Sequence, residues 1–204
     1  IKVIANLVAY PERAPKHLKD YYKRREQEKL NEFRTYKSHP AILAWYIADE
    51  VKYEYRHLIE ARRNMINRVD PFHPTCSIYY RLNDIPLMGA CQDILGTDPY
   101  PLQDNDVEDM AWIRQYLETA KKTGLPAWDS YQVFGYSELN YHKYAHFRKK
   151  MDEMGVNFKP ERRAPNQKEM RSYLIFHAIL GMRSFRGYSF DAIFQVPPEV
   201  REAY

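Results

Sequence analysis

The chain has 204 residues, of which 45% are hydrophobic and 15% aromatic, enough for one domain with a sizeable core. Eighteen tyrosines and thirteen prolines against seven glycines exclude fibrous and low-complexity classes. The formal net charge is only +4, and basic side chains alternate with acidic ones, which disfavours a nucleic-acid partner. No apolar stretch reaches the roughly 18 residues that cross a bilayer, so we expect no membrane partner.

The first part of the chain alternates between apolar runs and charged segments with helical periodicity. Residues 1–10 are rich in β-branched side chains and end before Pro11, which predicts a buried strand. Residues 16–37 space their apolar side chains for a helix. The next predicted elements are a strand at 41–48, a helix at 53–70 and a strand at 75–80.

The same alternation continues to the carboxyl end. The clearest helix is 104–124, with acidic residues in its first turn, lysines in its last and Gly124 as its cap. The other predicted elements are a strand at 91–98, a strand at 126–135, an aromatic and basic insertion at about 136–163, a helix at 166–185 and a strand at 187–196.

Strands that are apolar on both faces and alternate with helices predict an α/β fold with a parallel sheet. No phosphate loop or dinucleotide-binding glycine pattern follows the first strand, which disfavours a nucleotide-binding sheet. The six strands therefore fit a (β/α)₈ TIM-type barrel that lacks its first two β/α units. We expect residues 1–204 to form one partial barrel, a fragment or processed product. Its two open edges should make the isolated chain unstable or associated.

Metal and cofactor signals are weak. Cys76 and Cys91 have no metal-ligand spacing, and both free thiols and a disulfide remain open. His142 and His146 form an HxxxH pair, but the glutamate and third ligand of a zinc site are missing. We therefore predict neither a metal nor a cofactor, and leave the oligomeric state open.

Carboxylates, amides and aromatic side chains gather at the predicted carboxyl ends of the strands, where barrel enzymes place their reactive groups. Aromatic faces stack on the C–H surfaces of pyranose rings, and carboxylates bind sugar hydroxyls, so this mixture favours a carbohydrate site. The alternative is that these residues are polar only because strands end in loops. The candidates are Tyr10, Asp49, Glu50, Tyr80, Asp98, Tyr100, Trp128 (at a strand start), Gln132, Tyr188 and Asp191.

Several segments resemble, in order, those of clan A glycoside hydrolases. Residues 39–50 ("HPAILAWYIADE") resemble the fourth barrel strand, which ends in the acid/base glutamate. Residues 69–75 ("VDPFHPT") resemble the turn after the next helix, and residues 93–102 ("DILGTDPYPL") resemble the sixth strand. Residues 125–135 and 165–190 resemble the seventh strand and the helix leading to the eighth. The match covers nearly the whole chain as strands three to eight.

The resemblance implies a glycosidase that cleaves an oligo- or polysaccharide, with Glu50 as the proton donor. Asp49 stands where the family has an asparagine that holds a sugar hydroxyl, and its charge would favour a protonated Glu50. Gln132 stands where the family has its nucleophilic glutamate, although an amide cannot form a glycosyl ester. Asp98 or Asp191 would then supply the second carboxylate.

Other interpretations remain open. A shifted register would bring Asp129 or Glu138 to the strand end, or an N-acetyl group of the substrate could attack. The barrel could also bind carbohydrate without cleaving it. A Schiff-base lyase or aldolase is disfavoured, because Lys2 lies at a strand start and the other lysines fall in helices or loops. In style the segments resemble those of poorly characterised bacterial members of the clan. A secreted or periplasmic location is slightly favoured over a cytoplasmic one.

Overall fold

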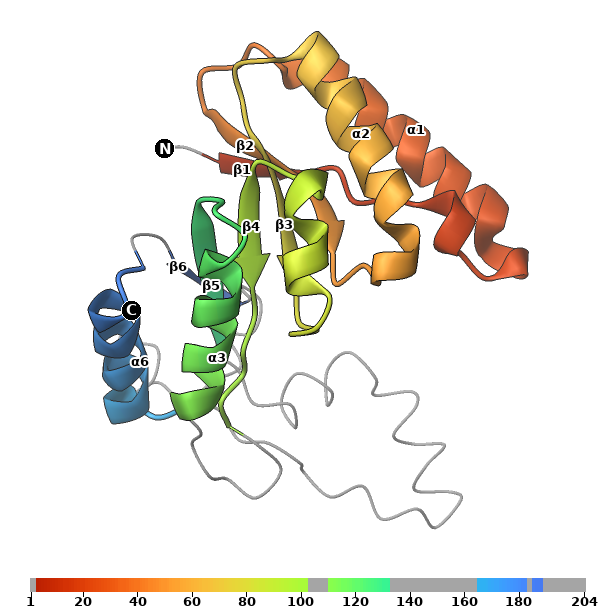
Figure 1. Ribbon diagram of the computed structural model, residues 1–204. Coiled ribbons are helices and arrows are strands. Elements are labelled where there is room, and N and C mark those ends of the chain that lie inside the picture. Colours follow the sequence, from red (N-terminus) through yellow and green to blue (C-terminus); the bar gives the residue numbers. More distant parts are fainter. Residues whose placement is uncertain (1–2, 103–109, 133–164, 183–184, 189–204) are drawn as a thin grey trace. The chain divides into compact units, whose positions relative to one another are not determined.

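The computed structural model describes residues 3–102, 110–132, 165–182 and 185–188 (Figure 1). The chain divides into two compact units, Ile1–Thr97 with Thr119–Ala127, and Asp98–Glu118 with Trp128–Tyr204. The predicted insertion at 136–163, with its two histidines, and the candidate Asp191 lie outside the described residues.

The first unit is an α/β arrangement of parallel strands. Its main elements are β1 (Val3–Asn6), α1 (Lys19–Tyr36), β2 (Ile42–Asp49), α2 (Arg56–Val69), β3 (Thr75–Tyr79) and β4 (Ile94–Thr97). Short 3-10 helices join them: η1 (Pro11–Arg13), η2 (Lys16–Leu18), η3 (Tyr53–Tyr55) and η4 (Ile85–Cys91). The strand order is β1-β2-β3-β4, and each neighbouring pair is parallel. The predicted alternation and the parallel pairing are confirmed here.

The second unit contains another parallel pair of strands with a helix between them. Its elements are α3 (Met110–Lys121), which ends in the first unit, β5 (Ala127–Gln132), α6 (Gln167–Ile179) and β6 (Phe185–Tyr188). The α6 helix begins with a capping box, in which the Asn166 side chain accepts from the backbone N–H of Glu169 and the Glu169 side chain accepts from that of Asn166. In β5 and β6, Asp129 pairs with Phe185 and Gln132 with Tyr188.

The last predicted helix and strand were placed wrongly. The helix was expected to continue to residue 185 and the strand to begin at 187, but α6 ends at Ile179 and β6 begins at Phe185. Gly181 explains the early end, because its φ of +78° is a left-handed conformation that terminates helices.

The core of the first unit is built around Trp45 of β2. Its ring meets Phe33 of α1 edge to face, with centroids 4.9 Å apart, and both side chains are fully buried. The indole N–H donates to Asp70 Oδ2 at 2.8 Å. Asp70 also accepts from the backbone N–H groups of Phe72 and His73, and so holds the turn that follows α2. Trp45 therefore packs the core and fixes the turn after α2.

The two helices of the first unit lie side by side (Figure 1). Arg62 of α2 forms an ion pair with Glu26 of α1.

No described helix of the chain is both long and apolar enough to cross a membrane. Cys76 and Cys91 are buried thiols, which settles the alternative between thiols and a disulfide. Burial raises the pKa of the Cys91 thiol to about 12, so it stays protonated.

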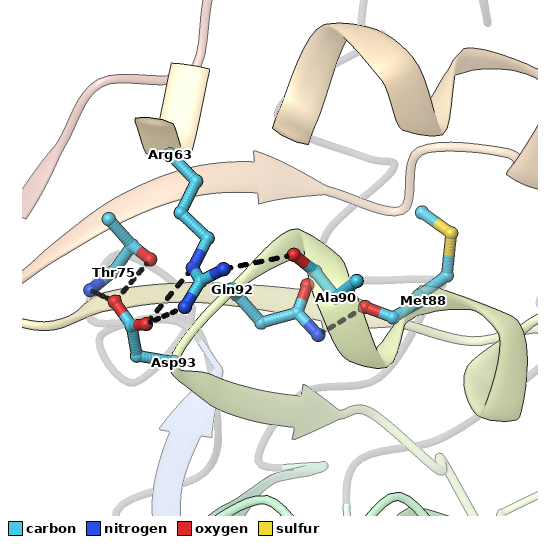
Figure 2. A network of polar contacts seen from close by, with 6 residues as sticks. All are labelled: Arg63, Thr75, Met88, Ala90, Gln92 and Asp93. Carbon is cyan, nitrogen blue, oxygen red and sulfur yellow. Dashed lines mark hydrogen bonds and ion pairs between the residues drawn. The ribbon is translucent and has the colours of Figure 1, made fainter. Parts of the chain in front are cut away.

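A polar network fixes the amino end of β3 (Figure 2). One oxygen of Asp93 accepts from the backbone N–H and hydroxyl of Thr75, both at 2.8 Å. The other accepts from Nε and Nη2 of Arg63 at 3.0 and 2.6 Å. Arg63 Nη1 donates to Ala90 O at 3.2 Å, and the Gln92 amide donates to Met88 O at 2.6 Å. The network joins α2, β3 and the end of η4.

We expect Asp93→Asn to lower the free energy of unfolding at pH 7 by roughly 1–3 kcal/mol, because the Arg63 guanidinium loses its carboxylate. Burial alone would raise the pKa of Asp93, but the bonds from Thr75 and Arg63 outweigh it and lower that pKa below its ordinary value. The carboxylate therefore stabilises the fold above about pH 4, and its contribution disappears as the pH falls through the lowered pKa. Urea unfolding at several pH values should show wild type and variant converging in acid; a constant difference would contradict this.

Candidate functional site

The strand β2 delivers two carboxylates at its carboxyl end. Its residues 44–48 are buried, whereas Asp49 and Glu50 are exposed. The strand is paired on both sides, with β1 and β3, and the Glu50 backbone N–H donates to Ile78 O at 2.9 Å. The predicted end of this strand is therefore confirmed. Ligand sites of parallel α/β sheets lie at such carboxyl ends.

Glu50 has an unusual backbone. Its φ is +48°, and it is the only non-glycine residue with positive φ among the residues that the structure describes. This left-handed conformation costs an L-residue about 1–2 kcal/mol. Just before it, the register of β2 against β3 shifts between Tyr46 and Ala48. Backbone strain and strand irregularities gather at functional sites, so both observations single out this end of β2.

Tyr46 holds the side chain of Asp49. The phenol is buried within the unit and donates to Asp49 Oδ1 at 2.5 Å. Because an ionised carboxylate has several acceptor positions, Asp49 Oδ2 and the remaining lone pairs stay open to a ligand hydroxyl. The spacing of Tyr46 and Asp49 was visible in the sequence, but the bulge that lets these two side chains meet was not.

Glu50 borders a shallow depression together with the residues after β3. The lining side chains are Glu50, Val51, Tyr79, Tyr80, Arg81 and Asp84. Tyr80 is 39% exposed, and the Arg81 guanidinium lies over its ring at 5.3 Å from the centroid. Of the predicted candidates, the structure therefore brings Glu50 and Tyr80 together. Arg81 directly follows Tyr80 at the same strand end, where the sequence also placed it without assigning it a role.

Tyr10 lies in the segment after β1 and is buried, with only 4% of its surface exposed. Its hydroxyl donates to Ile47 O at 2.6 Å, and the Arg62 guanidinium lies 5.0 Å from its ring centroid. Arg62 also donates to the carbonyls of Leu7 and Ala9, both at 3.1 Å. The Tyr10 hydroxyl thus already has a protein partner, and substrate binding by this residue stays a prediction.

The second unit contains the other described candidates. Gln132 ends β5, as predicted, and is fully buried. Its Oε1 accepts from the Leu102 backbone N–H at 3.2 Å, which links β5 to the segment that carries Asp98 and Tyr100. Asp98 is buried and Tyr100 half-buried. This segment and the end of β5 are therefore neighbours within the unit.

Trp128 and Tyr188 complete the described candidates. Trp128 lies near the start of β5 and is buried. Tyr188 ends β6, where it pairs in register with Gln132. Trp128 thus lies at the strand start that the sequence predicted, whereas Tyr188, near the start of the predicted strand 187–196, is the last residue of β6.

A buried pair of charged residues in the second unit was not predicted. Asp129 of β5 and His177 of α6 are 0% and 1% exposed, and His177 Nε2 contacts Asp129 Oδ2. The other ring nitrogen, Nδ1, lies 2.6 Å from Tyr173 O. Because both ring nitrogens face an acceptor, the charged imidazolium is favoured. Burial alone would lower the pKa of His177, but the bonds to Asp129 and Tyr173 O outweigh it and raise that pKa. A histidine on the apolar face of a helix gave no sequence signal for this partner.

Metal binding has no support in the described part of the chain. There, no three His, Cys, Asp or Glu side chains come together as a metal site requires.

No protein-family profile and no curated protein matches the sequence. Among solved structures, the chain is similar to a GH2 β-galacturonidase from Eisenbergiella tayi bound to galacturonate, with 18% identity and a TM-score of 0.49, over 66% of this chain and 25% of that chain. It is also similar to the PgaB (BpsB) glycoside hydrolase domain from Bordetella bronchiseptica, with 12% identity and a TM-score of 0.46, over 93% of this chain and 50% of that one. The chain thus spans a quarter of the first neighbour and half of the second, and both neighbours are glycoside hydrolases.

Proposed function

We propose that the protein is a glycoside hydrolase, built as one partial (β/α)₈ domain, that cleaves O-glycosidic bonds of an oligo- or polysaccharide. One observation carries the proposal: a strained Glu50 stands at the carboxyl end of a central parallel strand. Around it lie a second carboxylate, Asp49, and an aromatic side chain, Tyr80. An extracytoplasmic location would suit a polysaccharide substrate.

In this mechanism Glu50 acts as the general acid. Its carboxyl O–H gives a proton to the glycosidic oxygen while the bond from that oxygen to the anomeric carbon breaks. Asp98 is proposed as the second carboxylate. It attacks the anomeric carbon if the carboxyl groups are ~5–5.5 Å apart, and activates water if they are ~6.5–9.5 Å apart.

The remaining candidates are proposed to bind the sugar. Asp49, oriented by Tyr46, accepts a bond from a sugar hydroxyl, and Tyr80 offers an exposed ring for stacking. Further contacts are assigned to Tyr10, Tyr100, Trp128, Gln132, Tyr188 and Asp191.

The second candidate function is carbohydrate binding without cleavage. Gln132 supports it, because a fully buried amide whose oxygen accepts from Leu102 is no nucleophile. In that case the same strand ends would hold the saccharide, and no glycosidic bond would break.

A glycoside panel distinguishes the two functions. Hydrolysis is assayed for wild type, Glu50→Gln and, as a matched control, Glu12→Gln, which neutralises an exposed glutamate after β1. We expect Glu50→Gln to lower kcat/KM about 10²–10⁴-fold, since it removes the transferable proton, and Glu12→Gln to change little. Equal activity of all three proteins would remove Glu50 from the mechanism. Saccharide binding by a wild type that cleaves nothing would establish the second function.

A further inference from the structure

Arg81 is a charged group in the Glu50 depression that the proposed mechanism does not use. Its guanidinium lies over the Tyr80 ring, and its Nε donates to the Tyr80 hydroxyl at 2.9 Å. These contacts hold the guanidinium against the Tyr80 side chain at the border of the depression.

Arg81 forms no ion pair with any carboxylate in the described part of the chain, like Arg68 of α2 but unlike the other arginines of that helix. Three arginines of α2 show the contrast. Arg62 pairs with Glu26, Arg63 with Asp93 at 2.6 Å, and Arg56 with Glu60 at 3.9 Å. The positive charge of Arg81 is therefore not neutralised by an ion pair with a described residue.

The acidic side chains near Arg81 do not serve as its carboxylate partner. Asp84 and Glu54 act on it electrostatically, but neither forms an ion pair with it, and Asp84 Oδ2 accepts from the Tyr53 backbone N–H at 3.3 Å. Only Nε of the guanidinium has a hydrogen-bond partner in the described structure, so the edge formed by Nη1 and Nη2 is open. That planar edge matches the two oxygens of a carboxylate.

We propose that Arg81 binds a carboxylate of the substrate, which makes the substrate an acidic saccharide that contains uronic acid residues. The inference rests on the proposed function, because it assumes that a saccharide binds over the surface formed by Glu50, Tyr80 and Arg81. Its chemical basis is independent of catalysis, since a guanidinium recognises a uronate whether or not a glycosidic bond is cleaved.

Calorimetric titration of the full-length protein tests the proposal. The probes are oligouronates and their methyl esters, which keep the sugars and remove the charge. Wild type should bind the acids more tightly than the esters, and Arg81→Gln should weaken acid binding roughly ten- to a hundredfold without affecting the esters. Arg81→Lys keeps the charge but loses the planar edge, so we expect an intermediate affinity.

Arg56→Gln is the matched control. Arg56 also lies over a tyrosine ring, that of Tyr53 at 5.1 Å, but its charge is close to Glu60. Its removal should leave uronate binding unchanged. Equal loss in both arginine variants would overturn the proposal, because binding would then follow overall charge.

The outcomes separate this inference from the hydrolase. If uronate binding depends on Arg81 but the protein cleaves no glycoside, the inference is supported and the proposed hydrolase function is contradicted. If neutral glycosides are cleaved and their cleavage depends on Glu50 but not on Arg81, the hydrolase function is supported and the inference about uronates is contradicted. Equal binding of acids and esters, no binding of either, or tighter binding of sulfated neutral saccharides each overturns the assignment of a carboxylate.

Discussion

Replacing Glu50 with glycine is expected to lower kcat/KM by about two to four orders of magnitude and to raise the free energy of unfolding by about 1 kcal/mol. The activity is lost because the substitution removes the proposed proton donor. The fold is stabilised because the φ of +48° is strained for glutamate but accessible to glycine. The gain is smaller than the full strain, since glycine also loses more backbone entropy on folding.

Two further substitutions separate the side chain from the backbone. Glu50→Gln removes the acid and keeps the strain, so it should lose activity at unchanged stability. Glu50→Asn should also lose activity, with a stability between those of glutamine and glycine, because asparagine tolerates left-handed φ better than most residues. Urea unfolding of wild type and the three variants measures the order of their free energies of unfolding. A glycine variant no more stable than the glutamine variant would show that the backbone at Glu50 stores no strain.

The strand at the centre of the candidate site could be predicted from the sequence. An apolar run that ends abruptly in two carboxylates leaves few alternatives to a buried strand that emerges at Asp49 and Glu50, and β2 has that form. The left-handed backbone at Glu50 could not be predicted, because glutamate has no preference for positive φ. It follows from the pairing with β3, where the Glu50 N–H bonds to Ile78 O.

The boundaries of β1 and β4 depended on contacts far apart in the sequence. β1 was expected to continue to residue 10 but ends at Asn6, since the carbonyls of Leu7 and Ala9 accept from Arg62. The strand predicted from residue 91 begins only at Ile94, and Cys91 is the last residue of η4. Local periodicity carries no information about such partners.

The open guanidinium of Arg81 was equally invisible in the sequence. Many arginines follow strands, and the sequence does not show which of them lack a carboxylate partner. The sequence therefore predicted that Asp49 and Tyr80 stand at strand ends, whereas the contacts of Asp49 with the Tyr46 phenol and of Arg81 with the Tyr80 phenol required the structure.

The buried pair of Asp129 and His177 is expected to give the largest stability effect in the second unit. Replacing His177 with alanine should lower the free energy of unfolding by roughly 3–5 kcal/mol, because it leaves the Asp129 carboxylate without this partner in a fully buried position. Replacing both residues with leucine removes the two charges together and should cost less than the single substitution. Urea unfolding of the single and double variants measures the difference.

The pH dependence identifies the charged form of this pair. Burial alone would lower the pKa of His177, but the bond and charge of Asp129 and the Tyr173 carbonyl outweigh it and raise that pKa above the ordinary value of about 6.5. A raised histidine pKa stabilises the fold fully below about pH 6.5, and this contribution is lost as the pH rises through the folded-state value.

The stability difference between wild type and His177→Gln should therefore shrink as the pH is raised above about 6.5. Glutamine is the suitable comparison, because its amide can donate to Asp129 but carries no charge at any pH. A difference that stays constant, or grows with pH, would mean that His177 is neutral in the folded protein. The double leucine variant supplies the reference without either charge. Its stability should lack this pH dependence, which assigns the slope of the wild type to the pair that joins β5 to α6.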